Sequence, residues 1–471
     1  MALRMKLATA VAAAVLAFSA SADDVTKRVD EVFKDWSHSD APGCALAVTQ
    51  DGNIVFERGY GMADLEQGVA IRPDTVFNIA SLSKQFTAVA LLLLQEQGKL
   101  SLDDDVRKYV GELPDYGKRI TLRHLANHTS GLRDLPELLG LTGWNWVDDV
   151  PVPLALDLIG GQRQLNFAPG EKYAYSNSGY FLLAVIVERV SGQSFGQFTR
   201  ENIFTPLGML HSRFYDDRRM LMKNRAFGHV KLPGGGFGAW RPTYEVVGDG
   251  GLLTTVEDLA RWERNFLQPR LGRDPGKLVA DMLERGVLND GKKIDYGLGL
   301  MMGDYRGLPM VYHGGSVPGY NTIMLRLPQQ KFAAIVLCNV GGGPARVAAK
   351  AVADIYLDGQ FPHGPEAPTT RTPTDPPPKA QRQPNVSELK KLAGAYYSAE
   401  LNARYTLKVE GGQLIAVVGY QPPLPLYAVE SRRFHNSEYD LTLSFGGRGF
   451  ELHTGEISGM KFERTTSALT H

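Results

Sequence analysis

The chain contains 471 residues, and its 51 basic and 51 acidic side chains give a formal net charge of zero at pH 7. It has no basic run or stripe, which argues against a nucleic-acid or anionic-membrane partner. The length allows one large domain and a smaller one.

Residues 1–22 have the pattern of a cleavable export signal. Arg4 and Lys6 precede an apolar run from Leu7 to Phe18, and Ala20-Ser21-Ala22 ends the segment. The run is short for a membrane-spanning helix, and no cysteine stands at the cleavage point to accept a lipid. We therefore expect a periplasmic or secreted protein with no membrane association once the signal is removed.

The two cysteines, Cys44 and Cys338, are too few for a disulfide scaffold. Buried cysteines commonly behave as small apolar side chains, so we expect two buried free thiols. A single bridge formed in an oxidising compartment is the alternative.

The mature chain opens with a strand pattern and continues with helices. After an amphipathic segment at 25–36, Cys44–Thr49 and Ile54–Arg58 flank Asp51-Gly52, a strong signal for a hairpin turn. From Ser81 to about residue 266 the pattern is mainly helical, with long loops rich in glycine and proline.

Strand patterns return after Gly297. Three short apolar runs and one helix are predicted, at Met310–His313, Thr322–Leu327, Phe332–Leu337 and Ala345–Tyr356. Strands at both ends and helices between them predict an α+β domain over residues 23–360. In this domain an antiparallel sheet, built from both ends and covered by helices, faces a helical subdomain.

Residues 361–385 are rich in proline and nearly free of large apolar side chains, which is typical of an extended linker. Beyond it, residues 386–471 contain alternating segments joined by tight turns, at Tyr405–Glu410, Gln413–Val418, Tyr439–Phe445 and Phe450–His453. The pattern predicts a small lipocalin-like β-barrel or sandwich as a second domain.

Ser81 and Lys84 open a long apolar helix and would share one of its faces. A lysine buried there could lose its charge and accept the serine proton, which is how a serine nucleophile is activated. The same spacing recurs at Ser387 and Ser458, where a helix N-cap and a turn between strands explain it. We therefore select Ser81 as the candidate nucleophile.

Tyr175 and Asn177 precede a second apolar helix. A phenol can pass a proton to a leaving group, and an amide two residues later can hold a substrate carbonyl. Tyrosines in polar loops more commonly pack amphipathically, so this role depends on the presence of the Ser81 motif.

These motifs, in this order, resemble the serine β-lactamase and penicillin-binding protein superfamily. The likeness is to its class C β-lactamase-like branch, which includes D-peptidases, D-aminopeptidases and esterases. It spans about residues 25–356 and is carried by the segments 77–88, 120–132, 175–180 and 250–255. The resemblance implies catalysis by Ser81, Lys84 and Tyr175 without metal or cofactor, and it leaves open which of Lys84 and Tyr175 is the acylation base.

The third motif of the family, Lys-Thr-Gly or His-x-Gly on a strand, has two candidates here. His453-Thr454-Gly455 is the closer spelling, but His313-Gly314-Gly315 ends a predicted strand within the region of the other motifs. We select His313, Gly314 and Gly315, with Asn177, as substrate-binding residues. The resemblance then places the oxyanion hole at the backbone N–H groups of Ser81 and Ser316.

Three further residues have a more ordinary explanation. His124 and His128 stand four apart on a predicted helix, but the acid of a metalloprotease helix is missing, so we expect structural histidines and no metal site. Asp249 could meet a substrate ammonium, although an aspartate in a glycine-rich turn is usually structural. No Gly-x-Ser-x-Gly elbow is present, which disfavours an α/β-hydrolase.

We therefore expect an exported serine hydrolase that acts on small molecules or peptides through an acyl-enzyme, and we favour a D-amino-acid-specific peptidase or aminopeptidase. His313 in place of a fixed cation disfavours an efficient β-lactamase, and Gly314 lacks a hydroxyl that would grip a free carboxylate. A carboxylesterase or weak β-lactamase is the alternative. A non-catalytic penicillin or muropeptide sensor is another, and a homo-oligomer is compatible with the sequence.

Overall fold

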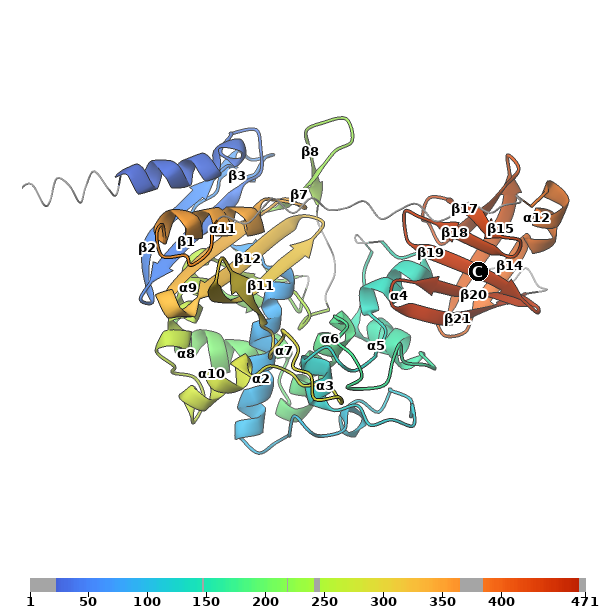
Figure 1. Ribbon diagram of the computed structural model, residues 1–471, viewed down its shortest axis with the longest axis horizontal. Helices are drawn as coiled ribbons and strands as arrows, with labels where there is room; N and C mark the ends of the chain where they lie inside the picture. The colour runs from blue at the N-terminus through green and yellow to red at the C-terminus, as the bar shows by residue number, and fades with distance from the viewer. Residues whose placement is uncertain (1–22, 146–147, 218, 241–245, 365–383, 466–471) are drawn as a thin grey trace, which may run out of the picture.

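The computed structural model describes residues 23–145, 148–217, 219–240, 246–364 and 384–465 (Figure 1). The expected signal, residues 1–22, lies outside these ranges, and so does most of the expected linker, residues 361–385. Within the described ranges no helix is long and apolar enough to cross a membrane.

A six-stranded antiparallel sheet forms the centre of the larger domain, with the strand order β10-β11-β12-β13-β1-β2. The strands are β1 (Cys44–Gln50), β2 (Asn53–Tyr60), β10 (Met301–Tyr305), β11 (Leu308–Val317), β12 (Tyr320–Leu327) and β13 (Phe332–Cys338). Because β1 pairs with β13, the two ends of the domain join in one sheet, which confirms the predicted fold class. All seven residues of β13 are buried, as expected of a central strand covered on both faces.

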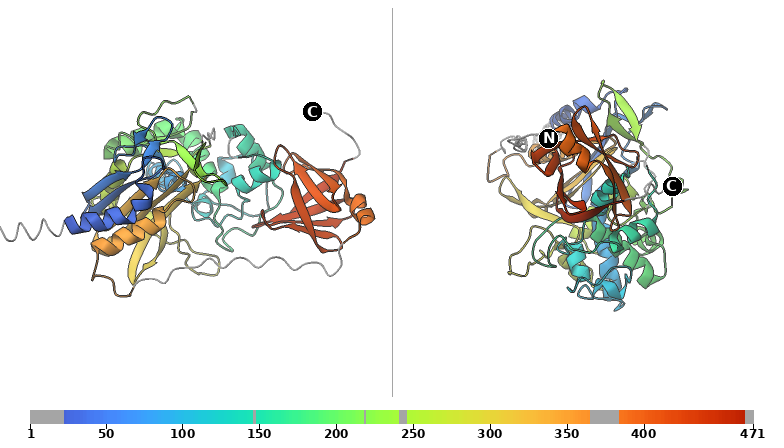
Figure 2. Two further views of the ribbon diagram at one scale, coloured as in Figure 1. Left: turned by 90° about the horizontal axis from the view of Figure 1, so that it is seen from above. Right: turned by 90° about the vertical axis from the view of Figure 1, so that its right-hand side faces the viewer.

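One face of the sheet is covered by the helix at 23–32 and by α11 (Ala345–Tyr356), which lie side by side (Figure 2). Val29 and Phe33 from the first segment share an apolar cluster with Ala348 and Val352 from α11. The helix expected at 345–356 therefore forms with the predicted bounds.

The other face of the sheet meets the helical subdomain. Its elements include α2 (Lys84–Glu96), α3 (Leu122–Ala126), α4 (Leu135–Thr142), α5 (Val152–Gly160), α6 (Asn177–Ser191), α7 (Phe195–Thr199), α8 (Thr205–Leu207), α9 (Val256–Leu267) and α10 (Pro275–Leu283). Residues 84–94 of α2 are all buried, which is the property of a helix at the centre of a core. Short strands accompany these helices: β3 (Met62–Asp64), β4 (Val69–Ala70) and β5 (Phe77–Asn78) precede α2, and β6 (Arg213–Phe214), β7 (Gly228–Lys231), β8 (Phe237–Trp240) and β9 (Leu252–Thr254) lie between α8 and α9.

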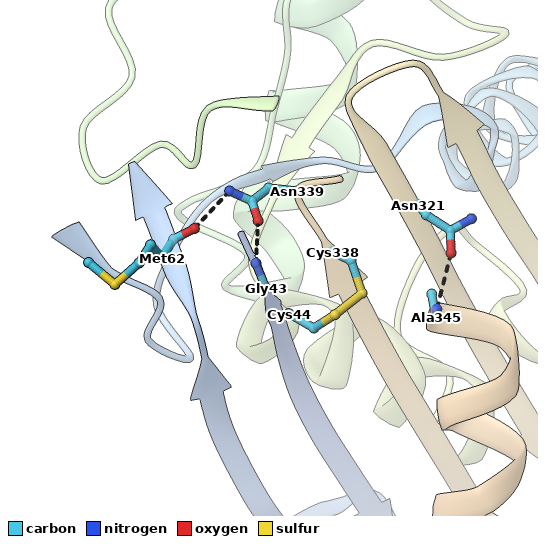
Figure 3. Close-up of a disulfide and its surroundings, with 7 residues drawn as sticks. All are labelled: Gly43, Cys44, Met62, Asn321, Cys338, Asn339 and Ala345. Carbon is cyan, nitrogen blue, oxygen red and sulfur yellow. Dashed lines mark hydrogen bonds between the residues drawn. A yellow bond between two sulfur atoms is a disulfide. The ribbon is translucent and has the colours of Figure 1, made fainter. Parts of the chain in front are cut away.

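Cys44 and Cys338 form a disulfide, so the expectation of two free thiols is wrong (Figure 3). The two residues are direct partners in the β1 and β13 pairing, with their Cα atoms 4.0 Å apart. The register of two strands separated by 294 positions in the sequence decides this contact, and no local pattern reveals it.

The smaller domain is a closed barrel of eight antiparallel strands. They are β14 (Gly394–Ser398), β15 (Ala403–Glu410), β16 (Gln413–Val418), β17 (Leu424–Glu430), β18 (Arg433–Asn436), β19 (Leu441–Gly446), β20 (Gly449–Thr454) and β21 (Ile457–Arg464). A short helix, α12 (Val386–Leu392), precedes them and is capped by Asn385 rather than by Ser387. Ser458 lies on β21 and not in a turn.

The barrel packs against the helical subdomain beside α4 (Figure 1). One apolar cluster runs through both, from Leu138 and Leu139 on α4 to Tyr405 in the barrel. The Tyr405 hydroxyl donates to the Leu141 carbonyl at 3.1 Å, and the Gln421 amide donates to the Trp144 carbonyl at 2.9 Å. The proline-rich segment thus connects two domains that share a packed interface.

Glu137 of α4 lies at this interface, where burial and the nearby carboxylates of Asp134 and Glu456 raise its pKa from 4.5 to about 7. The folded state therefore binds the Glu137 proton more tightly than the unfolded chain does. The resulting contribution to stability is complete below about pH 4.5 and is lost as the pH rises through about 7. We expect Glu137→Gln to reduce the loss of stability over this range, measured as the urea midpoint against pH. The exposed carboxyl of Glu410 provides the control variant Glu410→Gln, and an equal effect of both variants would contradict this prediction.

Candidate active site

Ser81 lies in a tight turn that runs directly into α2. The turn is the 3-10 segment Ala80–Ser83, and Ala80 has a positive φ of 48°, a conformation that costs energy for a residue other than glycine. Asn78 stabilises it by accepting a hydrogen bond from the Ala80 N–H at 2.8 Å. Thr322 of β12 donates to the Ile79 carbonyl at 2.9 Å and fixes the turn to the sheet. The backbone that carries Ser81 is therefore fixed by Asn78 from within the turn and by Thr322 from the sheet.

Lys84 is fully buried, and its ammonium donates three hydrogen bonds. The acceptors are Ser81 Oγ at 3.1 Å, Asn177 Oδ1 at 2.8 Å and the Asp249 carbonyl at 2.6 Å. Burial lowers the pKa of Lys84 to about 8, although the carboxylates of Asp249 and Asp134 oppose the shift. About one molecule in ten therefore carries the neutral amine at pH 7, and this form can accept the Ser81 proton.

The aromatic ring of Tyr175 packs against the Lys84 ammonium. The lysine Nζ lies 4.8 Å from the centre of the tyrosine ring, and the phenol hydrogen-bonds to the Ser81 side chain. Burial raises the pKa of Tyr175 well above its ordinary value of 10, and the contact with Ser81 offsets only part of the shift. The resting group is therefore a neutral phenol that can donate a proton.

His128 supports the Tyr175 ring. The two rings stack with their centres 4.2 Å apart, and His128 Nδ1 accepts a hydrogen bond from the Ser176 N–H at 3.0 Å. Burial lowers the pKa of His128 well below 6.5, so the imidazole is neutral. His124 instead forms a capping box with Thr121 at the start of α3. The two histidines thus make separate structural contacts.

His313 lies on β11 beside the catalytic residues, with its ring centre 6.3 Å from that of Tyr175. Its Nδ1 donates to the Gly314 carbonyl at 2.7 Å, and its Nε2 accepts from the Tyr296 hydroxyl at 3.1 Å. Burial and the nearby Lys84 charge lower the pKa of His313 to about 3. His453 lies on β20 and accepts a hydrogen bond from Gly459 within the barrel, so the structure brings His313 to this site.

Gly315 allows β11 to approach the Ser81 turn. A Cβ atom at this position would lie 2.1 Å from the Ile79 carbonyl oxygen, which no real side chain tolerates. A Cβ at Gly314 would meet only an ordinary contact at 3.4 Å. Ser81 and Ser316 consequently line the same cavity, and their assignment as the oxyanion hole stays a prediction.

The cavity above Ser81 has a volume of about 100 Å³. Its walls are formed by Asn78, Ala80, Ser81, Pro136, Asn177, Tyr215, Arg225, Trp240, Asp249, Gly250, Gly251, Ser316 and Val317. Asp249 is only 7% exposed, and its Oδ1 has no hydrogen-bond partner among the described residues. Burial raises the pKa of Asp249 to about 6, so it is mostly ionised at pH 7. The cavity thus carries a carboxylate next to the nucleophile.

Asp134 and Arg225 are among the polar residues of this site that the sequence analysis missed. Asp134, the N-cap of α4, accepts hydrogen bonds from the Asn177 backbone N–H and from Asn177 Nδ2, the latter at 3.2 Å. Arg225 brings a guanidinium to the cavity wall, stacked 4.8 Å from the centre of the Tyr215 ring. Both residues lie in loops without a recognisable motif, so only the folded chain identifies them.

Comparisons with known proteins agree with this geometry. The sequence profile of the Beta-lactamase family matches residues 25–357. A penicillin-binding protein of Bacillus subtilis is 32% identical over 323 residues, which cover 63% of this chain and 68% of that protein. D-aminopeptidases of Gluconobacter oxydans and Brucella anthropi are each 30% identical, over 63% and 66% of this chain. The matches span only 56% and 59% of those two enzymes.

Solved structures show the same fold. The octameric penicillin-binding protein homologue from Pyrococcus abyssi superimposes with a TM-score of 0.60 at 25% identity, over 94% of this chain and 99% of that one. The D-amino acid amidase of Ochrobactrum anthropi superimposes with a TM-score of 0.61 at 22% identity, over 72% of this chain and 99% of that one. The first match is extensive enough to include the barrel.

We expect Ser81→Ala to abolish covalent labelling by a fluorophosphonate, because no other serine has a buried lysine amine within hydrogen-bond distance of its Oγ among the described contacts. Ser387→Ala and Ser458→Ala remove the serines of the two other Ser-x-x-Lys pairs, so they are matched controls and should label normally. Labelling is read by in-gel fluorescence, and a labelled Ser81→Ala protein would overturn the assignment.

The pKa of Lys84 predicts the pH dependence of acylation. Because only the neutral amine accepts the proton, kcat/KM for an uncharged ester should rise with pH through a midpoint near 8. Below that midpoint most of the Lys84 side chains are protonated, and the rate should be low. Stopped-flow or steady-state rates from about pH 6 to pH 10 measure this limb. A rate that does not change across this range would show that Lys84 does not act as the base.

His313→Ala should lower kcat/KM on amide and ester substrates by roughly tenfold or more, by different factors for different substrates, because a group beside Tyr175 is lost. His453→Ala, in the barrel, is the matched control and should be nearly silent. Damage by His453→Ala together with a normal His313→Ala enzyme would reverse the choice of histidine.

Proposed function

The chain belongs to the Beta-lactamase family of serine hydrolases, and from this premise we propose that it is an exported aminopeptidase specific for D-amino acids. The observation that supports this substrate most directly is the Asp249 carboxylate in the cavity of Ser81, whose Oδ1 has no hydrogen-bond partner among the described residues. An aminopeptidase must hold the α-ammonium of the same residue whose carbonyl it attacks, on the carbon next to that carbonyl. A buried carboxylate in the cavity of Ser81 suits this task.

The proposed reaction begins with attack of Ser81 Oγ on the scissile carbonyl carbon, while neutral Lys84 accepts the hydroxyl proton. The backbone N–H groups of Ser81 and Ser316 hold the oxyanion. Tyr175 gives its proton to the leaving amine as the carbon–nitrogen bond breaks and regains one from the Lys84 ammonium, which leaves an ester on Ser81 and a neutral Lys84. Water then attacks this ester and gives a proton to Lys84, which returns it to Ser81 Oγ as the D-amino acid leaves. Asn177, which binds Lys84, also lines the cavity and can contact the substrate carbonyl.

The third motif supports an aminopeptidase over a carboxypeptidase. His313 is held neutral by burial and donates its Nδ1 proton to a backbone carbonyl, so it supplies no cation for a substrate carboxylate. Gly314 supplies no hydroxyl. Among the described residues, Arg225 lines the wall of the cavity with a guanidinium. In a longer substrate this cation can contact an anionic group that lies away from the scissile bond.

Export and assembly are also part of the proposal. The Cys44–Cys338 disulfide is typical of a protein that matures in an oxidising compartment, which supports a periplasmic or secreted location. The likeness of nearly the whole chain to an octameric homologue supports assembly of several copies. Neither inference affects the chemistry at Ser81.

The test uses the full mature chain and a panel of matched substrates. We expect steady release of ammonia from D-alanine amide, a rate at least tenfold lower for L-alanine amide, and a similar loss for N-acetyl-D-alanine amide, which lacks the ammonium. Nitrocefin and p-nitrophenyl acetate test the β-lactamase and esterase alternatives. Preferred cleavage of either one, or a burst of acylation without turnover, would contradict the proposed function.

A further inference from the structure

Arg133 joins the barrel to the helical subdomain through a buried guanidinium. The residue is only 2% exposed, although it precedes α4 in a loop. Its Nη1 donates to Glu400 Oε2 at 2.8 Å and to Gln162 Oε1 at 2.7 Å, and its Nη2 donates to the Ser458 carbonyl at 2.9 Å. Glu400 and Ser458 belong to the barrel, so the charge of Arg133 is compensated across the domain interface.

Glu400 is itself held in place by the helical subdomain. The Arg163 N–H donates to its carboxylate at 3.1 Å, and Gln162 Nε2 donates to its backbone carbonyl at 2.9 Å. Its side chain is 11% exposed in the ion pair with Arg133. A pair as buried as this one is costly to break, because each charge would remain in a poorly solvated place.

The backbone around Arg133 leads directly to the catalytic residues. Its carbonyl accepts a hydrogen bond from Ser178 Oγ at 2.6 Å, and Ser178 is fully buried at the start of α6. The next residue, Asp134, holds both the backbone and the side chain of Asn177. Asn177 Oδ1 in turn accepts from the Lys84 ammonium at 2.8 Å. Three contacts and the peptide bond between Arg133 and Asp134 therefore connect Glu400 in the barrel to Lys84.

We propose that Arg133 is a positioning residue for catalysis, through which the docked barrel holds Asn177 and Lys84 in their productive arrangement. With Glu400 neutralised, the buried guanidinium would lose its anionic partner, and the loop that carries Arg133 and the adjacent Asp134 would shift to place the charge elsewhere. Any displacement of Asp134 releases Asn177 and changes the environment of Lys84. The inference requires the acyl-enzyme chemistry of Ser81 but not the D-amino acid specificity proposed above.

The interface offers a matched control. Lys172 and Glu456 form a second ion pair between the same two domains, at 2.8 Å, but their side chains are 47% and 53% exposed. No hydrogen bond described for this pair leads to Lys84, and Glu456 is also close to Glu137. Loss of this exposed pair should therefore weaken docking little and leave the catalytic residues in place.

The experiment compares Glu400→Gln with Glu456→Gln in the full chain. The first observable is the second-order rate of fluorophosphonate labelling of Ser81, which does not depend on the natural substrate. We expect Glu400→Gln to slow labelling by tenfold or more and to shift the ascending limb of its pH profile, since Asp134 and Asp249 both act on the Lys84 charge. Glu456→Gln should label within twofold of the wild type.

Thermal midpoints separate positioning from simple stability. A Glu400→Gln protein with a lowered midpoint but an unchanged labelling rate and pH profile would overturn the proposal, because Arg133 would then serve docking alone. If Glu400→Gln does not fold, Arg133→Lys provides the same comparison, since it keeps the charge but cannot bind Glu400 and the Ser458 carbonyl with a rigid fork. Normal labelling of that variant would equally contradict a positioning role. Failure of the D-alanine amide assay with normal labelling would instead affect only the proposed function.

Discussion

The burial of the Lys84 ammonium is the constraint on which the catalytic centre depends. Taking this charge out of water is costly, and the cost is met by three acceptors from three separate segments, namely Ser81, Asn177 and the Asp249 carbonyl. The same burial lowers the pKa of Lys84 to about 8, so that at neutral pH a fraction of the side chain is uncharged and can accept a proton. The arrangement that satisfies the lysine is therefore also the one that activates Ser81 in the proposed reaction.

The fold brings those segments together with few degrees of freedom. Ser81 stands in a turn that is bonded to β12 through Thr322, and β11 approaches that turn because Gly315 has no side chain. Asn177 begins α6 and is anchored by Asp134 at the start of α4. The sheet that carries β11 and β12 is closed by the pairing of β1 with β13 and by the Cys44–Cys338 disulfide. Catalytic geometry and domain stability thus share the same contacts.

The barrel participates in this arrangement more closely than its position after a proline-rich segment suggests. It shares an apolar cluster with α4, and it supplies the anion for a guanidinium that would otherwise be buried without a counter-charge. Helix α4 lies between the cavity of Ser81 and the barrel. Its Pro136 lines that cavity, and its Leu141 carbonyl accepts a hydrogen bond from the Tyr405 hydroxyl. The two domains therefore share one packed interface, and α4 extends from it to the cavity of Ser81.

The sequence by itself determined what depends on local pattern. Residue spacing and hydrophobic periodicity identified Ser81 and Lys84, the strands on both sides of the helical region, the helix at 345–356 and the barrel-forming segments. The resemblance in motif order indicated Tyr175. It also favoured His313 over His453, although the residues that follow His453 match the third motif more closely. Only the tertiary structure revealed four features: the Cys44–Cys338 disulfide, the hydrogen bonds from Asn177 to Asp134, the position of Arg225 on the cavity wall and the Arg133–Glu400 ion pair. Each of these joins groups far apart in the chain or lies in a loop without a motif. Their proximity follows from strand register and domain packing, which local residue patterns do not encode.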